Sequence, residues 1–343
     1  MKKLLLSILA CNFLNAQTVT NYISTGITTP SGICFDNNGN LIVGELNSYK
    51  IFRYNAALTK TDLTPNYLNG APNQLAFNIL TNEIWFATEN SSAISKLTST
   101  NVLTEYFASG GPYGVAIDAQ GNIFYSEFFG KKIKKRQPDG TTTDFITGLQ
   151  SPTSMAFDLN GNLLVAESLN NRILKITSAG ISTILMTNLP NVRQIVVNTN
   201  GDIYVGGGTF SDIYRLQNGQ TTQSTFLTNI PCRGMAIKNN ELYISDATNN
   251  KILKVSLPTL ELNNFSKETS LNVYPNPTKG IINIETKEAL TVYVYDLLGR
   301  KVLESKIDET KNQINLNNLS GGTYLIKTRN EVGKGQSTKV VVE

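Results

Sequence analysis

Two arginines occupy equivalent places in successive repeats of this chain, and they are the residues best suited to bind a ligand. Arg193 and Arg233 lie 40 residues apart, and the same register holds Tyr113. Guanidinium groups bind carboxylates through paired hydrogen bonds, and a tyrosine adds a flat apolar surface. The combination favours a carboxylate or a sugar acid. The full register holds one residue per repeat: Ser31, Asn73, Tyr113, Thr153, Arg193 and Arg233.

A second register, about 14 residues further along each repeat, is mostly acidic. Its members are Glu45, Thr88, Glu127, Glu167, Gly207 and Asp246. These carboxylates could surround a calcium ion, which would suit a divalent-cation-dependent hydrolase, lactonase or lyase. They could equally accept hydrogen bonds within their own loops, from groups such as Asn171 or Asn250. The sequence leaves both alternatives open.

The chain contains no histidine, which limits the catalysis that it could perform. Histidine is the side chain best suited to proton transfer near neutral pH and a common zinc ligand. The sequence also lacks a Gly-x-Ser-x-Gly elbow and a phosphate-binding loop. Because no acid–base pair is evident, we predict no catalytic residue. With no imidazole and only two scattered cysteines after residue 17, we predict no zinc site and assign no metal ligand, and calcium stays a possible cofactor. A non-catalytic binding module, with a glycan or sugar acid as its ligand, is favoured over an enzyme.

The spacing of these residues predicts the fold. The first register advances by 42, 40, 40, 40 and 40 residues, and each unit holds four short β-like runs between turn residues. This period is typical of a propeller blade. We predict an all-β chain, with a six-bladed β-propeller followed by a small Ig-like β-sandwich. The innermost strands should crowd at the hub, so one inner-strand position should be small in every blade. We assign this position to Cys34, Ala76, Ala116, Ala156, Val196 and Ala236.

The N-terminal segment is expected to close the ring. Residues 18–27 (TVTNYISTGI) resemble the fourth strand of other repeats, whereas the last repeat stops after its third strand at Leu257. Pairing the two would remove open sheet edges. The recurrent Asp-x-x-Gly-Asn pieces that begin at Asp36, Asp118 and Asp158 predict hairpin turns rather than calcium loops.

The predicted organisation has four parts. Residues 1–17 form a signal peptide, 18–257 the propeller, 258–270 a polar linker and 271–343 a second β domain. No other stretch has transmembrane length, although Cys11 leaves a lipoprotein signal open. A disulfide between Cys34 and Cys232 also stays open. We expect a monomer that is secreted or held on the outer cell surface.

The net charge of +4 is spread thinly, so no nucleic-acid partner is expected. One dense basic patch, residues 131–136, alternates along a strand so that Lys132, Lys134 and Arg136 share a side. A solvated face explains this pattern, and an acidic surface glycan is the alternative partner.

The C-terminal motifs closely resemble the C-terminal sorting domain of type IX secretion cargo. They are Val273–Pro277 with Gly280, then residues 295–300 (YDLLGR), then Leu319–Tyr324 and the final Lys-Val-Val-Val. The hairpin turn of this domain is expected at residues 298–300. The resemblance implies export across the outer membrane of a Gram-negative cell. It also implies that residues 271–343 bind the type IX translocon, and such domains are commonly removed afterwards.

The propeller part resembles the NHL and SMP-30/gluconolactonase-like six-bladed families. The best copies of the shared pieces run from Glu167 to Arg172 and from Asp246 to Lys251. The resemblance implies the fold but leaves the function open. Lactonases of this kind hold a cation with a Glu near the start of the first blade, and residues 29–33 (TPSGI) contain no carboxylate. Lyase-type relatives use histidine, which this chain lacks.

Overall fold

The computed structural model describes residues 17–64, 68–89, 92–258, 271–296, 301–330 and 336–343. The predicted signal peptide and linker therefore lie almost wholly outside the described residues, as does the expected turn at residues 298–300. The chain forms two compact units that divide between Leu257 and Pro258.

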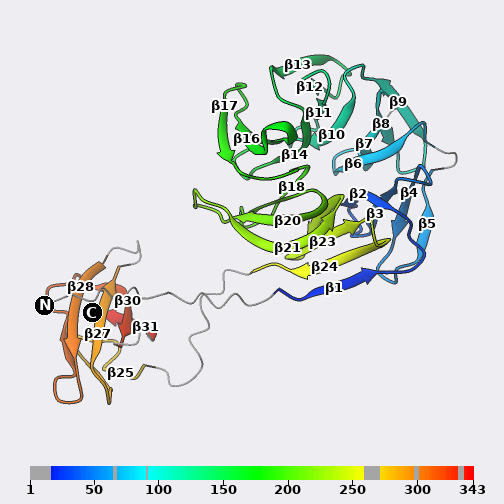
Figure 1. The fold of residues 1–343 in the computed structure, drawn as a ribbon. Coiled ribbons are helices and arrows are strands. Elements are labelled where there is room, and N and C mark those ends of the chain that lie inside the picture. Colours follow the sequence, from blue (N-terminus) through cyan, green and yellow to red (C-terminus); the bar gives the residue numbers. More distant parts are fainter. Residues whose placement is uncertain (1–16, 65–67, 90–91, 259–270, 297–300, 331–335) are drawn as a thin grey trace, which may run out of the picture. The chain divides into compact units, whose positions relative to one another are not determined.

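The described residues of the first unit form six antiparallel sheets of four strands each, which confirms the predicted propeller (Figure 1). Blade one is β2 to β5 (Pro30–Phe35, Leu41–Glu45, Lys50–Tyr54, Lys60–Asp62). Blade two is β6 to β9 (Ala71–Asn78, Glu83–Glu89, Ala93–Leu97, Leu103–Phe107). Blade three is β10 to β13 (Pro112–Ile117, Ile123–Glu127, Lys132–Arg136, Thr142–Thr147). Figure 1 shows the first strands of these blades toward the middle of the ring and the last strands at its periphery.

The remaining blades complete the ring. Blade four is β14 to β17 (Pro152–Phe157, Leu163–Glu167, Arg172–Ile176, Ser182–Met186), with the 3-10 turn η1 (Ser168–Asn170) between its second and third strands. Blade five is β18 to β21 (Gln194–Val197, Ile203–Gly206, Gly208–Leu216, Ser224–Cys232). Blade six is β22 to β24 (Gly234–Lys238, Glu241–Asp246, Lys251–Ser256) together with β1 (Val19–Ile23). The antiparallel pairing of β1 with β24 confirms the predicted closure.

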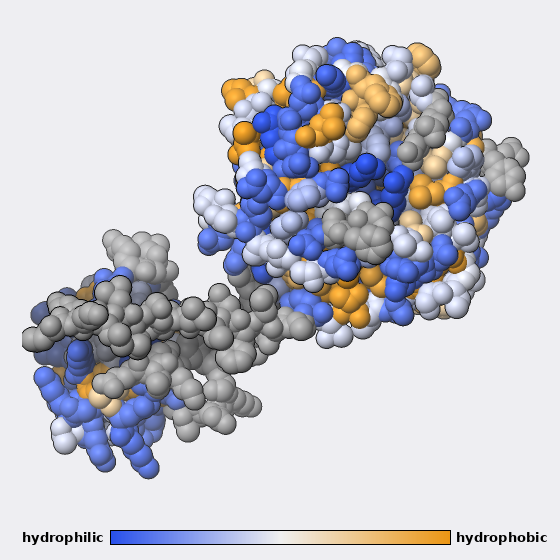
Figure 2. All heavy atoms as spheres, in the orientation of Figure 1, coloured by the Kyte–Doolittle hydropathy of each residue, from blue (hydrophilic) through white to orange (hydrophobic). Residues whose placement is uncertain are grey.

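The hydrophobic core lies between neighbouring blades. Ile42 and Ile51 of blade one pack with Leu75 and Phe86 of blade two, for example. All six positions predicted to lie at the hub are on the innermost strands β2, β6, β10, β14, β18 and β22. The closest approaches between these strands are at glycines: a Cβ on Gly32 would lie 1.7 Å from the Asn73 carbonyl oxygen. Figure 2 shows hydrophobic and hydrophilic residues intermixed over the visible face of this unit. Most of the large apolar side chains thus serve contacts between blades rather than a continuous apolar surface.

The predicted turns are present and are closed by their own aspartates. Asp158 Oδ1 accepts hydrogen bonds from the amides of Asn160 (2.9 Å) and Asn162 (2.8 Å), and Gly161 adopts a positive φ of 76°. Asp36 and Asp118 accept the equivalent bonds in their own turns. The repeated acidic motif is therefore used for turn formation.

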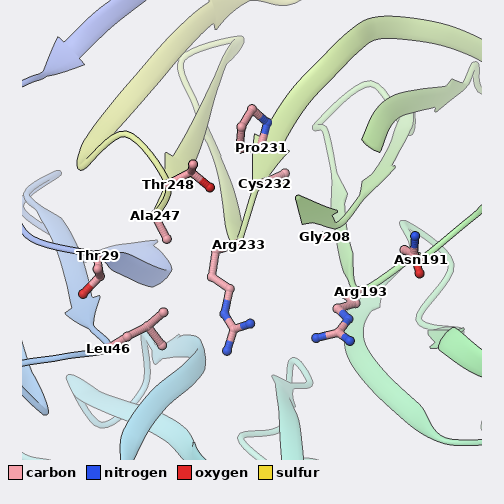
Figure 3. Close-up of a pocket in the computed structure, with 10 residues that line it drawn as sticks. All are labelled: Thr29, Leu46, Asn191, Arg193, Gly208, Pro231, Cys232, Arg233, Ala247 and Thr248. Carbon is pink, nitrogen blue, oxygen red and sulfur yellow. The ribbon is translucent and has the colours of Figure 1, made fainter. Parts of the chain in front are cut away.

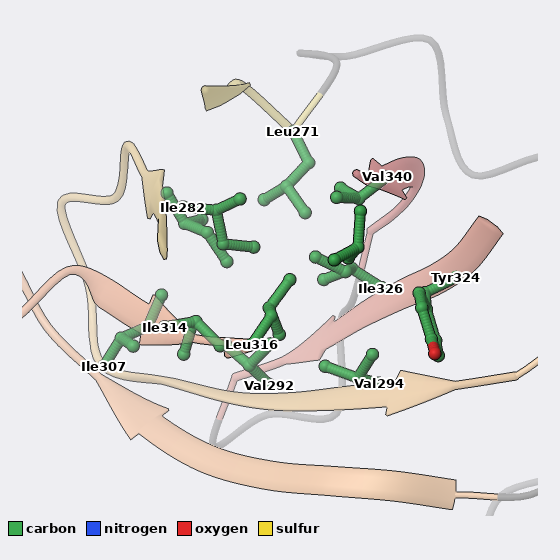
Figure 4. Close-up of a cluster of buried hydrophobic side chains, with 12 residues drawn as sticks. Leu271, Ile282, Val292, Val294, Ile307, Ile314, Leu316, Tyr324, Ile326 and Val340 are labelled. Carbon is green, nitrogen blue, oxygen red and sulfur yellow. The ribbon is translucent and has the colours of Figure 1, made fainter. Parts of the chain in front are cut away.

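The second unit is a β-sandwich of two sheets. One sheet holds β25, β26 and β29 (Val273–Tyr274, Ile281–Ile284, Gln313–Asn315), and the other holds β28, β27, β30 and β31 (Lys301–Ile307, Leu290–Tyr295, Gly322–Arg329, Ser337–Val342). Figure 4 shows the buried side chains gathered between the strands, including Ile282, Val292 and Ile326. This unit has a core of its own.

Candidate functional site

The two predicted arginines lie at the starts of neighbouring innermost strands. Arg193 precedes β18 and Arg233 precedes β22. Their backbone amides donate to the carbonyl oxygens of Gly206 and Ser245, each at 2.9 Å. Gln194 Nε2 also donates to the Arg233 carbonyl oxygen at 2.8 Å, which links blades five and six. The backbone beneath both side chains is therefore well anchored.

Both arginines line one pocket of about 480 Å³, here called the arginine pocket. In Figure 3 both arginine side chains extend from their strands into this pocket. The pocket is lined by Thr29, Leu46, Asn191, Arg193, Gly208, Pro231, Cys232, Arg233, Ala247 and Thr248. The lining includes two cations and no carboxylate, so its charge suits an anion.

Arg193 is available to a ligand. Among the described residues, its guanidinium makes no hydrogen bond or ion pair. Cys232 in the same pocket is a buried free thiol, and burial raises its pKa to about 12. It is therefore protonated at neutral pH and unsuited to act as a nucleophile. Cys34 is free as well, so the two cysteines form no disulfide.

A second pocket, of about 310 Å³, shares Arg193 with the first and is here called the aromatic pocket. It is lined by Asn73, Thr88, Ser92, Ser109, Gly111, Pro112, Tyr113, Phe128, Phe129 and Arg193. The ring centroids of Tyr113 and Phe128 lie 6.3 Å apart. Those of Phe128 and Phe129 lie 5.1 Å apart, with the two rings edge to face. Four residues of the predicted set thus line two pockets that have Arg193 in common: Asn73, Tyr113, Arg193 and Arg233.

The predicted carboxylates lie elsewhere, below the surface and in contact with their own loops. The Glu167 side chain is 1% exposed, and it accepts hydrogen bonds from the Gln150 amide (2.6 Å) and from Arg172 Nε (2.5 Å). Glu45 accepts from Lys60 Nζ at 2.8 Å and from Ser48 Oγ at 2.9 Å. Both carboxylates therefore already accept hydrogen bonds from residues of their own blade.

Asp246 follows the same pattern, whereas among the described residues Glu127 has an ion pair in place of hydrogen bonds. Asp246 is buried and accepts from the amide and the side-chain nitrogen of Asn249, at 2.9 and 2.7 Å. Glu127 is buried with Lys132 Nζ 3.7 Å away. Thr153 is also buried, and its hydroxyl donates to the Ala166 carbonyl oxygen at 3.3 Å. None of Glu45, Glu127, Glu167, Asp246 and Thr153 lines the arginine pocket or the aromatic pocket. Within the described part of the chain, no three carboxylate or thiol groups converge on a possible metal position.

The basic patch on β12 is partly neutralised within its own blade. Lys132 and Lys134 both bind Asp144 of β13, with nitrogen–oxygen distances of 3.2 and 2.7 Å. Arg136 instead lies over the ring of Tyr106 in blade two, 4.1 Å from its centroid. These contacts account for the alternating charges without a partner.

Phe128 and Phe129 were not among the residues expected from the sequence. They follow Glu127 at places where blade four has Ser168 and Leu169. Such variation against a repeating frame also distinguished Tyr113, and it is the signal that could have identified them. They line the aromatic pocket because of the path of the loop after β11, and no local sequence pattern predicts that path.

Residues 272–343 match the family described as the secretion system C-terminal sorting domain. The second unit is a member of this family. The sorting domain indicates export by the type IX secretion system, to the cell surface or the extracellular space. Among the described residues we find no helix with the length and hydrophobicity of a membrane span.

The propeller unit is similar to solved propeller structures of diverse function. A gluconolactonase from Xanthomonas campestris superposes with a TM-score of 0.59 at 13% identity, over 71% of this chain and 91% of that one. Virginiamycin B lyase from Staphylococcus aureus gives 0.55 at 19%, over 71% and 89%. A nidogen/laminin complex gives 0.54 at 16%, over 60% and 84%. At such low identity these similarities establish the fold alone. No curated protein matches the chain.

Proposed function

We propose that the propeller is a binding module that captures an acidic ligand, a sugar acid or an acidic glycan, after export. The observation that carries this proposal is the arginine pocket. Arg193 and Arg233 point their guanidinium groups into one space whose lining includes no carboxylate. Two converging guanidinium groups can hold a carboxylate through charge-assisted hydrogen bonds, and they would repel a cation.

The size and the polarity of the pocket support a small polar ligand. Its volume of about 480 Å³ lies within the usual range of small-molecule sites, roughly 300–1,000 Å³. Thr29, Asn191 and Thr248 add hydroxyl and amide groups to the lining. Such groups suit the hydroxyls of a sugar, while the arginines bind its carboxylate.

The same proposal assigns the partner of the sorting domain. Residues 271–343 bind the type IX translocon, and the propeller acts as a monomer at the cell surface or beyond it. A divalent-cation-dependent hydrolase, lactonase or lyase is the alternative. It has less support, because the four carboxylates that it needs are buried. Glu45, Glu167 and Asp246 accept hydrogen bonds within their own blades, and Glu127 forms an ion pair with Lys132.

The test is a double substitution, Arg193→Ala with Arg233→Ala, in the chain from Thr18 onward. We expect the affinity for a uronic acid to fall about 100-fold or more, because each lost charge-assisted hydrogen bond contributes about 1.5–3 kcal/mol. The melting temperature should stay the same. Isothermal titration with the acid and with its neutral parent sugar measures the effect.

The matched control is Lys134→Ala with Arg136→Ala, which removes the same charge from the outer part of blade three. It should bind like the wild type. Loss of binding in this control, with retention in the Arg193/Arg233 variant, would move the site to the basic patch and overturn the proposal.

A further inference from the structure

The aromatic pocket adjoins the arginine pocket, since Arg193 lines both. We infer that Phe129 and Phe128 form a stacking subsite for a second sugar ring, so that the preferred ligand is an acidic oligosaccharide rather than a single sugar acid. This inference rests on the proposed function and specifies its ligand. Three observations support it. The Phe129 ring is exposed, the side-chain amide nitrogen of Asn73 lacks a hydrogen-bond partner among the described residues, and Arg193 lines both pockets.

Phe129 is an exposed residue on a loop whose backbone is hydrogen-bonded to a neighbouring loop. Its side chain is 80% exposed, yet its amide donates to the Gly110 carbonyl oxygen at 2.9 Å. The amide of Phe128 donates to the Gly111 carbonyl oxygen, also at 2.9 Å. Two loops are thereby joined, one before β10 and one after β11. The backbone that carries the exposed ring is therefore anchored and does not have to be ordered when a ligand binds.

Glycine is required where the Phe129 ring rests. A Cβ on Gly111 would lie 2.5 Å from Phe129 Cδ2, and Gly111 has a φ of +68°. Below it, a Cβ on Gly110 would lie 2.5 Å from the Cβ of the buried Glu127. The two glycines let the loops pack closely enough to support the ring. Glu127, predicted as a ligand residue, thus packs against Gly110 and does not line the aromatic pocket.

The frame of the propeller does not require this aromatic residue. The equivalent position in blade four is Leu169, which is exposed as well, and in blade six it is Thr248. An exposed ring on an anchored backbone is suited to stack on a ligand. Sugars offer an apolar face of C–H groups to such rings.

Asn73 supplies the second observation. It is 4% exposed, it lines the aromatic pocket, and its Nδ2 has no hydrogen-bond partner within the described structure. A buried donor without a partner is unfavourable unless a ligand or a water accepts from it. A sugar hydroxyl in the aromatic pocket would be such an acceptor. Ser92 and Ser109 line the same pocket and add two hydroxyl groups.

The experiment compares a uronic acid monomer with its oligomer of two to four units, both titrated into the chain from Thr18 onward. The wild type should bind the oligomer at least tenfold more tightly. Phe129→Ala should remove this gain and leave monomer affinity unchanged, whereas Phe129→Trp should retain it. Leu169→Ala is the matched control and should change neither affinity. Asn73→Ala should also weaken oligomer binding without lowering the melting temperature.

The outcomes separate the inference from the proposed function. Equal affinities for monomer and oligomer, or an oligomer gain that survives Phe129→Ala, would overturn the subsite and leave the arginine pocket standing. If Phe129→Ala weakens oligomer binding while Arg193→Ala with Arg233→Ala does not, the proposed acid site fails instead. Failure of the wild type to bind either ligand at millimolar concentration would overturn both.

Discussion

At the scale of single residues, position in the repeat did not distinguish a binding side chain from a structural one. Arg193 and Glu167 both vary against a repeating frame, but one points into a pocket and the other is enclosed by its own loop. The difference arises from the groups that surround each side chain: Glu167 has hydrogen-bond donors from its own blade, whereas no acceptor for the Arg193 guanidinium lies among the described residues. Glu167 meets the Gln150 amide and Arg172, which come from different turns of the blade. Such convergence cannot be deduced from residue types alone.

The carboxylates are expected to contribute to stability rather than to bind calcium. Glu167→Gln replaces one charged acceptor with an amide nitrogen that cannot accept, so a buried donor loses its partner. We expect the free energy of unfolding to fall by about 2–4 kcal/mol. Asp144→Asn is the control, since this aspartate is exposed, and it should change the same quantity by less than about 1 kcal/mol.

Thermal unfolding in the presence of calcium or of EDTA tests whether the carboxylates bind calcium. Neither addition should shift the melting temperature of the wild type or of Glu167→Gln. A calcium-dependent rise that Glu167→Gln abolishes would make Glu167 a metal ligand and would favour the hydrolase alternative.

At the scale of elements, the sequence predicted much more. Hairpin turns and alternating strands leave local patterns, so the number of blades, their order and their closure were all legible in the repeat. Contacts across the hub leave no such pattern. Gln74 of blade two donates to the Met155 carbonyl oxygen of blade four at 2.8 Å, and it accepts from the Val115 amide of blade three at 3.2 Å. One side chain thus bridges three blades, and a local pattern could not have revealed it.

The closing strand is expected to stabilise the whole ring. Ile23 of β1 is buried in a cluster that joins blade one to blade six, with Ile33 and Tyr243 among its members. Ile23→Ala should lower the free energy of unfolding by about 2–4 kcal/mol, because it leaves a cavity at this junction. Thr20→Ala, at an exposed position of the same strand, is the control. Chemical denaturation would measure both, and a loss below about 1 kcal/mol for Ile23→Ala would show that the ring does not depend on this strand.

At the scale of the whole molecule, the proposed binding pockets and the sorting domain belong to separate compact units. The core of the sorting domain consists of residues after position 270, and the cores between blades consist of residues before position 258. Among the described residues, no core cluster has members from both units. Substitutions that change what the propeller binds should therefore leave the export signal intact.

Deleting residues 271–343 tests this division. The shortened chain should keep the melting temperature and the ligand affinity of the propeller, since all six blades and both pockets lie before residue 258. In a cell with type IX secretion it should remain in the periplasm, because the translocon has no sorting domain to bind. Fractionation of such cells, with the intact chain beside it, measures the location. Export of the shortened chain would show that the signal lies in the propeller, whereas loss of folding would show that the two units depend on each other.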